Sequence, residues 1–198
     1  MIRQPFLNTP YNPDREKEPD KKLMRLMHHN FKHAGYKLAR FGHGGFFSLD
    51  HNYWDGLPLD GVVMLRTIYT LPGQRNQGIQ RAIISTVNSM AYKTGCAVLA
   101  VAHTFEPRAK IATERDFVDS YGQEYGDPFE YFGPDSKENR RQNEAFKRAG
   151  WQNIDVHENI GTEWITPEYC WIMIPGTASR ELKQQLKPRL VEPVSSPV

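Results

Sequence analysis

A glycine-bearing loop between an apolar strand and an amphipathic helix is the segment of this chain best suited to chemistry. The loop spans residues 71–78 (LPGQRNQG), and the helix opens with Ile79-Gln80-Arg81. A loop of this kind presents several backbone N–H groups to one point in space, and the helix dipole adds positive potential there. We therefore expect a phosphate group to bind at residues 75–81.

The elements around this loop follow from hydrophobic patterns and turn residues. An apolar run predicts a strand over 61–71, and apolar positions at helical spacing predict a helix over 79–92. A second apolar strand is expected over 97–103. A second helix is expected over 136–149, opened by Asp135 and Glu138 as a capping box and ended by Gly150.

The loop pattern, Pro72 followed by Arg75-x-x-Gly78, matches a known motif. It resembles the pyrophosphate loop of the GNAT superfamily, the acetyl-CoA-dependent N-acyltransferases, which reads Val-x-Pro and then Arg/Gln-x-x-Gly-x-Gly/Ala. Gln80 departs from the motif, because the family prefers Gly or Ala at that position.

A second motif further along the chain is similar to another hallmark of this family. Segment 139–151 reads Asn-x-x-Gln-x-x-x-Phe-x-x-x-Gly-Trp, and the family reads Asn-x-x-Ala-x-x-x-Tyr-x-x-x-Gly-Phe. The motifs occur in the family's order, and the resemblance covers residues 61–175. It implies an α/β fold with a mixed, mostly antiparallel sheet that is splayed between the fourth and fifth strands, with flanking helices. Those two strands would be 61–71 and 97–103.

The resemblance also implies where acetyl-CoA, as co-substrate, would bind. Backbone groups of the first strand would pair with the pantetheine amides, as an added strand pairs with a sheet edge. The pyrophosphate would lie on the loop and the first helical turn, and the second helix would contact the pantetheine arm. The expected cofactor-binding residues are Ile68, Tyr69, Thr70, Arg75, Asn76, Gln77, Gly78, Ile79, Gln80, Arg81, Asn139 and Phe146.

Phe146 stands where the family usually has the tyrosine that protonates the coenzyme A thiolate, and a phenylalanine cannot donate a proton. Candidate substitutes are Tyr69, Tyr121, Tyr125 and Tyr131, of which we take Tyr131 as the candidate catalytic acid. The thiolate could also leave without an acid, because a thiol pKa near ~8.5 makes it a tolerable leaving group.

His103 and Glu106 are the candidate general bases, since both follow the second apolar strand, beside the expected thioester. An alkylamine is an ammonium ion at neutral pH and must lose a proton before it can attack. His103 titrates in the required range. The alternative is a histidine at a strand end that is hydrogen-bonded to backbone.

Residues 104–135 form a long insertion between the second strand and the second helix. Carboxylates alternate there with aromatic rings, a composition that suits a cationic, amine-bearing acceptor. Long segments of this kind often act as lids. The alternative is a solvated acidic loop.

Composition limits the remaining function classes. With 198 residues and a net charge of +2, the chain makes no strong case for nucleic acid as a partner. Cys96 and Cys170 are expected as buried free thiols in a reducing compartment.

No apolar run is long enough for a membrane helix, so a cytoplasmic protein without a membrane partner is expected. His29 and His33 lie one turn apart but lack a third ligand, so no metal is expected. A homodimer is compatible with the sequence.

The domain division follows from proline-rich ends. Residues 1–20 read as an extended leader, 21–176 as one GNAT-like domain with the 104–135 insertion, and 177–198 as a C-terminal tail with a small helix over 177–187. Residues 20–35 are expected to form a helix, and 36–41 and 46–49 short strands.

The sequence therefore predicts an N-acetyltransferase that moves an acetyl group from acetyl-CoA to a primary amine by direct attack. Two alternatives stay open. One is a divergent enzyme of the same fold that modifies a nucleic-acid base, with the basic helix over 20–35 as its electrostatic footprint. The other is a catalytically weak CoA-binding or interaction module, which Phe146 and Gln80 favour.

Overall fold

The structure is a computed structural model that describes residues 38–41, 45–51, 59–70, 75–102, 105–107, 129–131, 136–156 and 169–191. For 38–40, 46, 50–51, 105–107 and 129–131 it describes the backbone alone. The leader 1–20 and the helix expected over 20–35 lie outside these residues, so both stay predictions.

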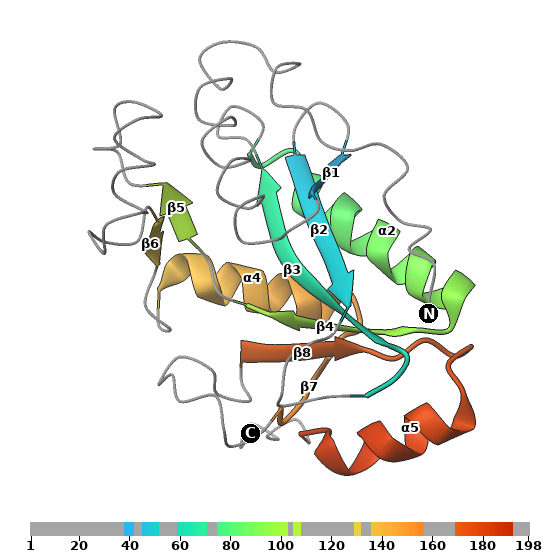
Figure 1. Ribbon diagram of the computed structural model, residues 1–198. Helices are drawn as coiled ribbons and strands as arrows, with labels where there is room; N and C mark the ends of the chain where they lie inside the picture. Colours follow the sequence, from blue (N-terminus) through green and yellow to red (C-terminus); the bar gives the residue numbers. More distant parts are fainter. Residues whose placement is uncertain are drawn as a thin grey trace, which may run out of the picture.

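A six-stranded mixed sheet forms the centre of the fold (Figure 1). Neighbouring strands are antiparallel except β3 and β4, which are parallel and are joined through helix α2 (Ile79–Thr94). The predicted mixed and mostly antiparallel sheet is confirmed. In spatial order the strands are β1 (Leu38–Phe41), β2 (Gly45–His51), β3 (Val62–Thr70), β4 (Ala97–Val101), β8 (Cys170–Met173) and β7 (Gln152–Asn153).

Strands β3 and β4 diverge after a short paired stretch. The pairs run from Val62 with Ala97 to Leu65 with Ala100, whereas β3 continues to Thr70. Figure 1 shows β3 turning away from β4 beyond this stretch. The splay expected between the family's fourth and fifth strands is confirmed at β3 and β4.

The divergence begins at an irregularity in the pairing of β3 with β2. Ser48 and Leu49 are adjacent on β2, but their partners on β3 are Thr67 and Leu65, so Arg66 is an extra residue, as in a β-bulge. A bulge bends its strand. It also shifts the alternation of side chains by one residue, so that beyond the bulge each set of alternate side chains faces the opposite side of the sheet. Since it directly follows the last β3 residue paired with β4, it supplies a physical cause for the splay.

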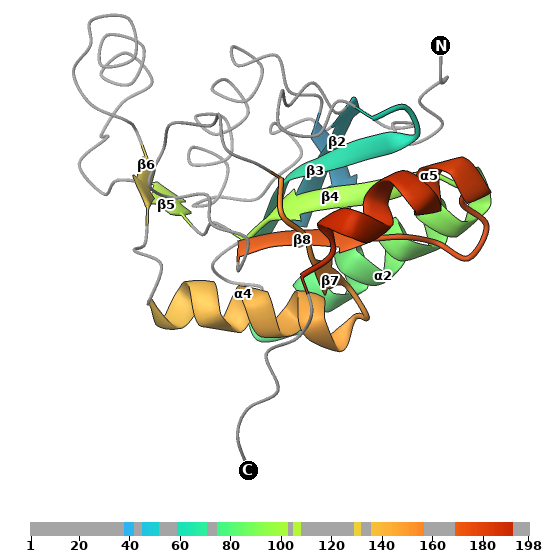
Figure 2. The ribbon, with the colours of Figure 1, turned by 90° about the horizontal axis from the view of Figure 1, so that it is seen from below.

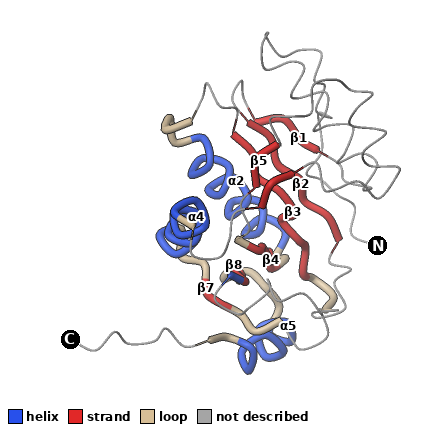
Figure 3. The backbone as a smooth tube through the Cα atoms, turned by 90° about the vertical axis from the view of Figure 1, so that its left-hand side faces the viewer, coloured by secondary structure: helices blue, strands red, loops and turns tan. Residues whose placement is uncertain are grey.

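Both faces of the sheet are buried, as alternate residues of β4 show. Val98 and Ala100 belong to the core under α2 and α4 (Lys137–Arg148), whereas Leu99 belongs to a second core with Leu182 and Leu186 of α5 (Arg180–Leu186). Figure 2 shows α4 and α5 on opposite sides of β8, and Figure 3 shows α2 and α4 on the same side of the sheet. The site described below lies on the α2 and α4 side.

The chain from 177 to 191 belongs to the folded domain, so the expected tail starting at residue 177 is wrong over this stretch. The predicted small helix is present as α5, and Leu186 is fully buried. Beyond it the 3₁₀ helix η4 (Lys187–Arg189) leads to Val191, whose N–H donates to the carbonyl oxygen of Asn153 at 3.0 Å. The domain therefore extends at least to Val191, because two leucines one helical turn apart bury α5 against the sheet.

Helix α4 starts at a different cap from the one predicted. Ser136 is the N-cap, and its Oγ accepts a hydrogen bond from the Asn139 N–H at 3.1 Å. The expected cap, Asp135, is therefore wrong by one residue, since a serine in extended conformation serves as well. Gly150 follows the helix with a φ of 81°, so the predicted stop is confirmed.

The ends of the 104–135 insertion pair with each other. Strand β5 (Phe105–Pro107) and strand β6 (Phe129–Tyr131) form a two-stranded antiparallel sheet, which the sequence analysis did not predict. Residues 108–128 lie outside the described part of the chain.

Both cysteines are free and buried, so the prediction of buried thiols is confirmed. Burial, with a smaller contribution from the nearby Asp155 charge, raises the pKa of the Cys170 thiol to about 12. Within the described part of the chain, no helix has the length and apolar character to cross a bilayer. The same residues contain no His, Cys, Asp or Glu cluster that could hold a metal ion. His29 and His33 lie outside them.

Candidate functional site

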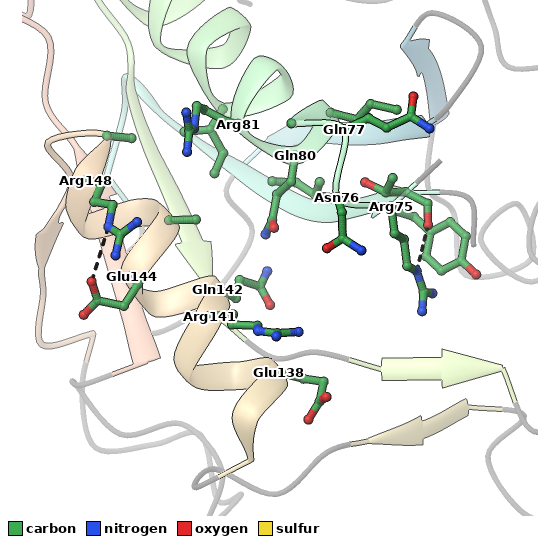
Figure 4. Close-up of a pocket in the computed structure, with 18 of the residues that line it drawn as sticks. Arg75, Asn76, Gln77, Gln80, Arg81, Glu138, Arg141, Gln142, Glu144 and Arg148 are labelled. Carbon is green, nitrogen blue, oxygen red and sulfur yellow. Dashed lines mark hydrogen bonds and ion pairs between the residues drawn. The ribbon is translucent and has the colours of Figure 1, made fainter. Parts of the chain in front are cut away.

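A cavity of about 1610 Å³ lies between the start of α2 and the facing side of α4 (Figure 4). Pockets for small molecules commonly measure roughly 300–1,000 Å³, so this one accommodates a long ligand. All the residues predicted to bind the cofactor on β3 and in the loop line it. The described lining is Ile68, Tyr69 and Thr70 of β3; Arg75 to Arg81 and Ile84; and Lys137, Glu138, Arg140, Arg141, Gln142, Glu144, Ala145, Arg148 and Ala149.

The loop enters α2 through two residues of left-handed conformation. Asn76 has a φ of 64° and Gly78 a φ of 76°, and Gly78 is the N-cap of α2. A Cβ added at Gly78 would meet no described atom within 4 Å. Glycine is therefore favoured there by its φ rather than by lack of room, and the position stays open toward a ligand.

The N-terminus of α2 lacks the capping groups of the other described α-helices. The first intrahelical bond runs from the Ala82 N–H to the Gly78 oxygen at 3.0 Å, so the N–H groups of 79–81 have no acceptor within the helix. Gly78 provides no side-chain cap, whereas Ser136 and Ser179 cap α4 and α5. The first turn of α2 also has no acidic residue, unlike the other two. This helix start is suited to an external anion.

The charge of the cavity wall is strongly positive. Six basic and two acidic side chains are among its lining residues. Glu144 is paired with Arg148 at 3.6 Å, and Arg75 Nε donates to the Thr70 carbonyl oxygen at 3.5 Å. Basic groups therefore face the α2 N-terminus from α4 as well as from the loop, an arrangement that favours a ligand with several negative charges. The basic residues are Arg75, Arg81, Lys137, Arg140, Arg141 and Arg148.

Two predicted cofactor residues are not among the lining residues. Asn139 and Phe146 are each 1% exposed, and Phe146 belongs to the hydrophobic core under α2 and α4. The Phe146 ring lies 4.7 Å from that of Trp151 and 6.3 Å from that of Trp171, measured between ring centroids. Phe146 is therefore a core residue, packed between Trp151, which follows α4, and Trp171 of β8, and its contact with a cofactor stays a prediction.

Gln142, which stands where the second motif of the family has an alanine and was not expected at the site, is a lining residue. It is 8% exposed, and among the described residues its Oε1 has no hydrogen-bond partner. No sequence signal marked it, since α4 has polar residues on most of its surface.

Two tryptophan–asparagine hydrogen bonds hold α4 in place. Trp151 Nε1 donates to Asn88 Oδ1 at 2.7 Å, and Asn88 Nδ2 donates to the Ala149 oxygen at 3.2 Å. Trp171 Nε1 donates to Asn143 Oδ1 at 2.7 Å. The first pair joins α2 to the end of α4 and the second joins α4 to β8. Together they fix the two helices that form the cavity.

The candidate catalytic residues are described in part. His103 lies outside the described residues, and Glu106 and Tyr131 are described as backbone only. Tyr131 pairs with Phe105, the residue before Glu106, so the pairing of β5 with β6 brings the backbones of these two positions close together in space. The small sheet lies near the N-terminal end of α4, whose first residues line the cavity (Figures 1 and 2).

The chain is similar to solved structures but matches no protein-family model and no curated protein. One similar structure, from Desulfovibrio desulfuricans, is described as "a putative acetyltransferase of the GNAT family". It is 15% identical over 81% of this chain and 84% of that chain, with a TM-score of 0.37.

Proposed function

We propose that the protein transfers an acetyl group from acetyl-CoA to a primary amine of an acceptor. The observation that carries the proposal is the uncapped N-terminus of α2, which opens into a cavity with six basic side chains. Backbone donors and positive charge in this combination suit a pyrophosphate. The resemblance of 71–81 and 139–151 to GNAT motifs supports the same ligand.

The pantetheine arm has a place on β3. Beyond Leu65 the ladder with β4 has ended, and Ile68 and Thr70 line the cavity that continues to the loop. Amides of an extended ligand can pair with a strand edge as an added strand does. We therefore place the pyrophosphate at α2 and the thioester toward the β3–β4 gap, along the part of β3 that lines the cavity.

The proposed reaction is direct acyl transfer. The acceptor nitrogen attacks the thioester carbonyl carbon, the carbon–sulfur bond breaks, and coenzyme A departs as a thiolate. The acceptor arrives as an ammonium ion with a pKa near ~10.4, so a base must remove its proton. We assign this role to His103 or Glu106 and assign protonation of the thiolate to Tyr131, since Phe146 has no proton to give.

Thiol release from acetyl-CoA, measured with a polyamine, a basic peptide and a nucleic acid as acceptors, tests the proposal. We expect release that requires an amine acceptor and saturates with both substrates. Gly78→Asp should lower kcat/KM for acetyl-CoA. Release that does not depend on an amine would contradict amine acetylation.

A CoA-binding module without transfer is the second candidate, and the observation that favours it is Phe146. A core phenylalanine replaces the usual acid, and of the tyrosines considered as substitutes only Tyr69 is described with its side chain. In that case CoA would bind at the α2 site and no acceptor in the panel would be acetylated. The basic helix on which base modification would depend lies outside the described residues.

A further inference from the structure

Gln142 on the wall of the cavity presents a buried hydrogen-bonding group that the protein does not satisfy. Its side chain is 8% exposed, and among the described residues its Oε1 has no hydrogen-bond partner. Buried side-chain acceptors of this kind are paired in the large majority of cases. An unsatisfied one beside a cavity therefore points to a donor that arrives with the ligand.

The neighbours of Gln142 on α4 have other roles. Phe146 packs in the core, and Asn143 accepts the hydrogen bond from Trp171. Gln142 itself lies on the side of α4 that faces Gln80 and Asn76 (Figure 4). The last torsion of a glutamine side chain has broad wells, so its carbonyl can turn toward the cavity at little cost. Gln142 therefore lines the same cavity as the N-terminus of α2, which suits a pyrophosphate.

The ligand expected between β3 and α4 has a matching donor. In a trans amide the carbonyl and the N–H point in opposite directions. A pantetheine amide whose carbonyl accepts a hydrogen bond from the backbone of β3 therefore directs its N–H away from β3, toward the α4 wall. Gln142 is one of the residues of this wall, at the position where the GNAT motif has an alanine, which has no acceptor in its side chain.

We propose that Gln142 is a specificity-determining residue whose carbonyl accepts a hydrogen bond from an amide N–H of the pantetheine arm. This inference rests on the proposed binding of coenzyme A and goes beyond it, because it assigns the pantetheine arm a second contact on the wall opposite β3. The nucleotide half of coenzyme A contains no such amide. Gln142 therefore favours the whole thioester over its nucleotide fragment.

Calorimetric titration with two probes, coenzyme A and adenosine 3′,5′-bisphosphate, tests the inference. The variants are Gln142→Met, which keeps the length of the side chain, and Gln142→Ala, which restores the residue of the motif. Lys147→Ala is the matched control, since Lys147 is exposed on α4 and is not among the lining residues. The loss of one neutral hydrogen bond should raise the Kd for coenzyme A about threefold to tenfold in both Gln142 variants. The Kd for the bisphosphate should stay within about twofold of the wild-type value.

Each other outcome has a definite meaning. Equal weakening of both probes in variants that keep the wild-type circular dichroism spectrum would show that Gln142 shapes the cavity rather than contacts the pantetheine. An unchanged Kd for coenzyme A would overturn the inference while leaving coenzyme A binding intact. If the wild-type protein binds neither probe, the proposed function fails first, and the role of Gln142 fails with it.

Discussion

Replacing Gly78 by aspartate and by asparagine separates charge from shape at the start of α2. A Cβ at this position meets no described atom within 4 Å, and its φ of 76° is one that Asn and Asp adopt more readily than other side chains. The two variants should therefore fold alike. They differ by one negative charge next to the helix start where the pyrophosphate is expected.

The size of the effect follows from Coulomb's law. Two unit charges 4 Å apart repel by about 1 kcal/mol in water and by about 4 kcal/mol at an effective dielectric of 20. We expect Gly78→Asp to bind coenzyme A about fivefold to several hundredfold more weakly than Gly78→Asn, by calorimetry at low salt. The gap should narrow as salt is added, because the site is exposed. Equal affinities for the two variants would refute an anion site at this helix.

Three further predictions concern the elements that hold the site. Phe146→Tyr should lower the midpoint of thermal unfolding, because an unpaired hydroxyl at a 1% exposed position between two tryptophans costs about 1–3 kcal/mol. An unchanged midpoint would mean that the core offers the hydroxyl a hydrogen-bond partner. Asn88→Ala removes the hydrogen bond with Trp151, so it should destabilise the fold by about 1–3 kcal/mol and weaken coenzyme A binding, although Asn88 is not a lining residue. Wild-type affinity in a folded variant would show that this hydrogen bond does not determine the shape of the cavity. The pKa of the Cys170 thiol is raised from 9.0 to about 12, so above about pH 9 the folded state keeps a proton that the unfolded state loses, and the free energy of unfolding measured in urea should fall as pH rises. Cys170→Ala should show a smaller fall with pH, and an equal fall in both proteins would assign the effect to other groups.

The parts of the fold that could be predicted are those with local signals. Apolar runs and helical spacing indicated β3, α2 and β4, and Gly78 indicated the loop, because a glycine directly before an amphipathic helix marks the turn that leads into it. The GNAT resemblance then supplied the arrangement of these elements, including the splay. Both kinds of inference depend on residues that lie close together in the sequence.

The parts that could not be predicted depend on contacts between distant residues. Arg66 has no property that marks it as the extra residue of a bulge, since the irregularity exists only relative to β2. The hydrogen bond between Asn88 and Trp151 joins residues 63 positions apart. The inward position of Phe146 and the cavity position of Gln142 follow from how α4 is rotated against the sheet. A helix so rich in polar residues does not reveal that rotation by its pattern.

A crystal structure of the protein grown with coenzyme A is the most direct test of the proposed site. The account predicts the pyrophosphate on the N–H groups of Ile79 to Arg81, with the pantetheine arm beside Ile68 and the sulfur at the gap between β3 and β4. Coenzyme A bound elsewhere, or crystals in which the α2 start stays without ligand at saturating coenzyme A, would contradict it.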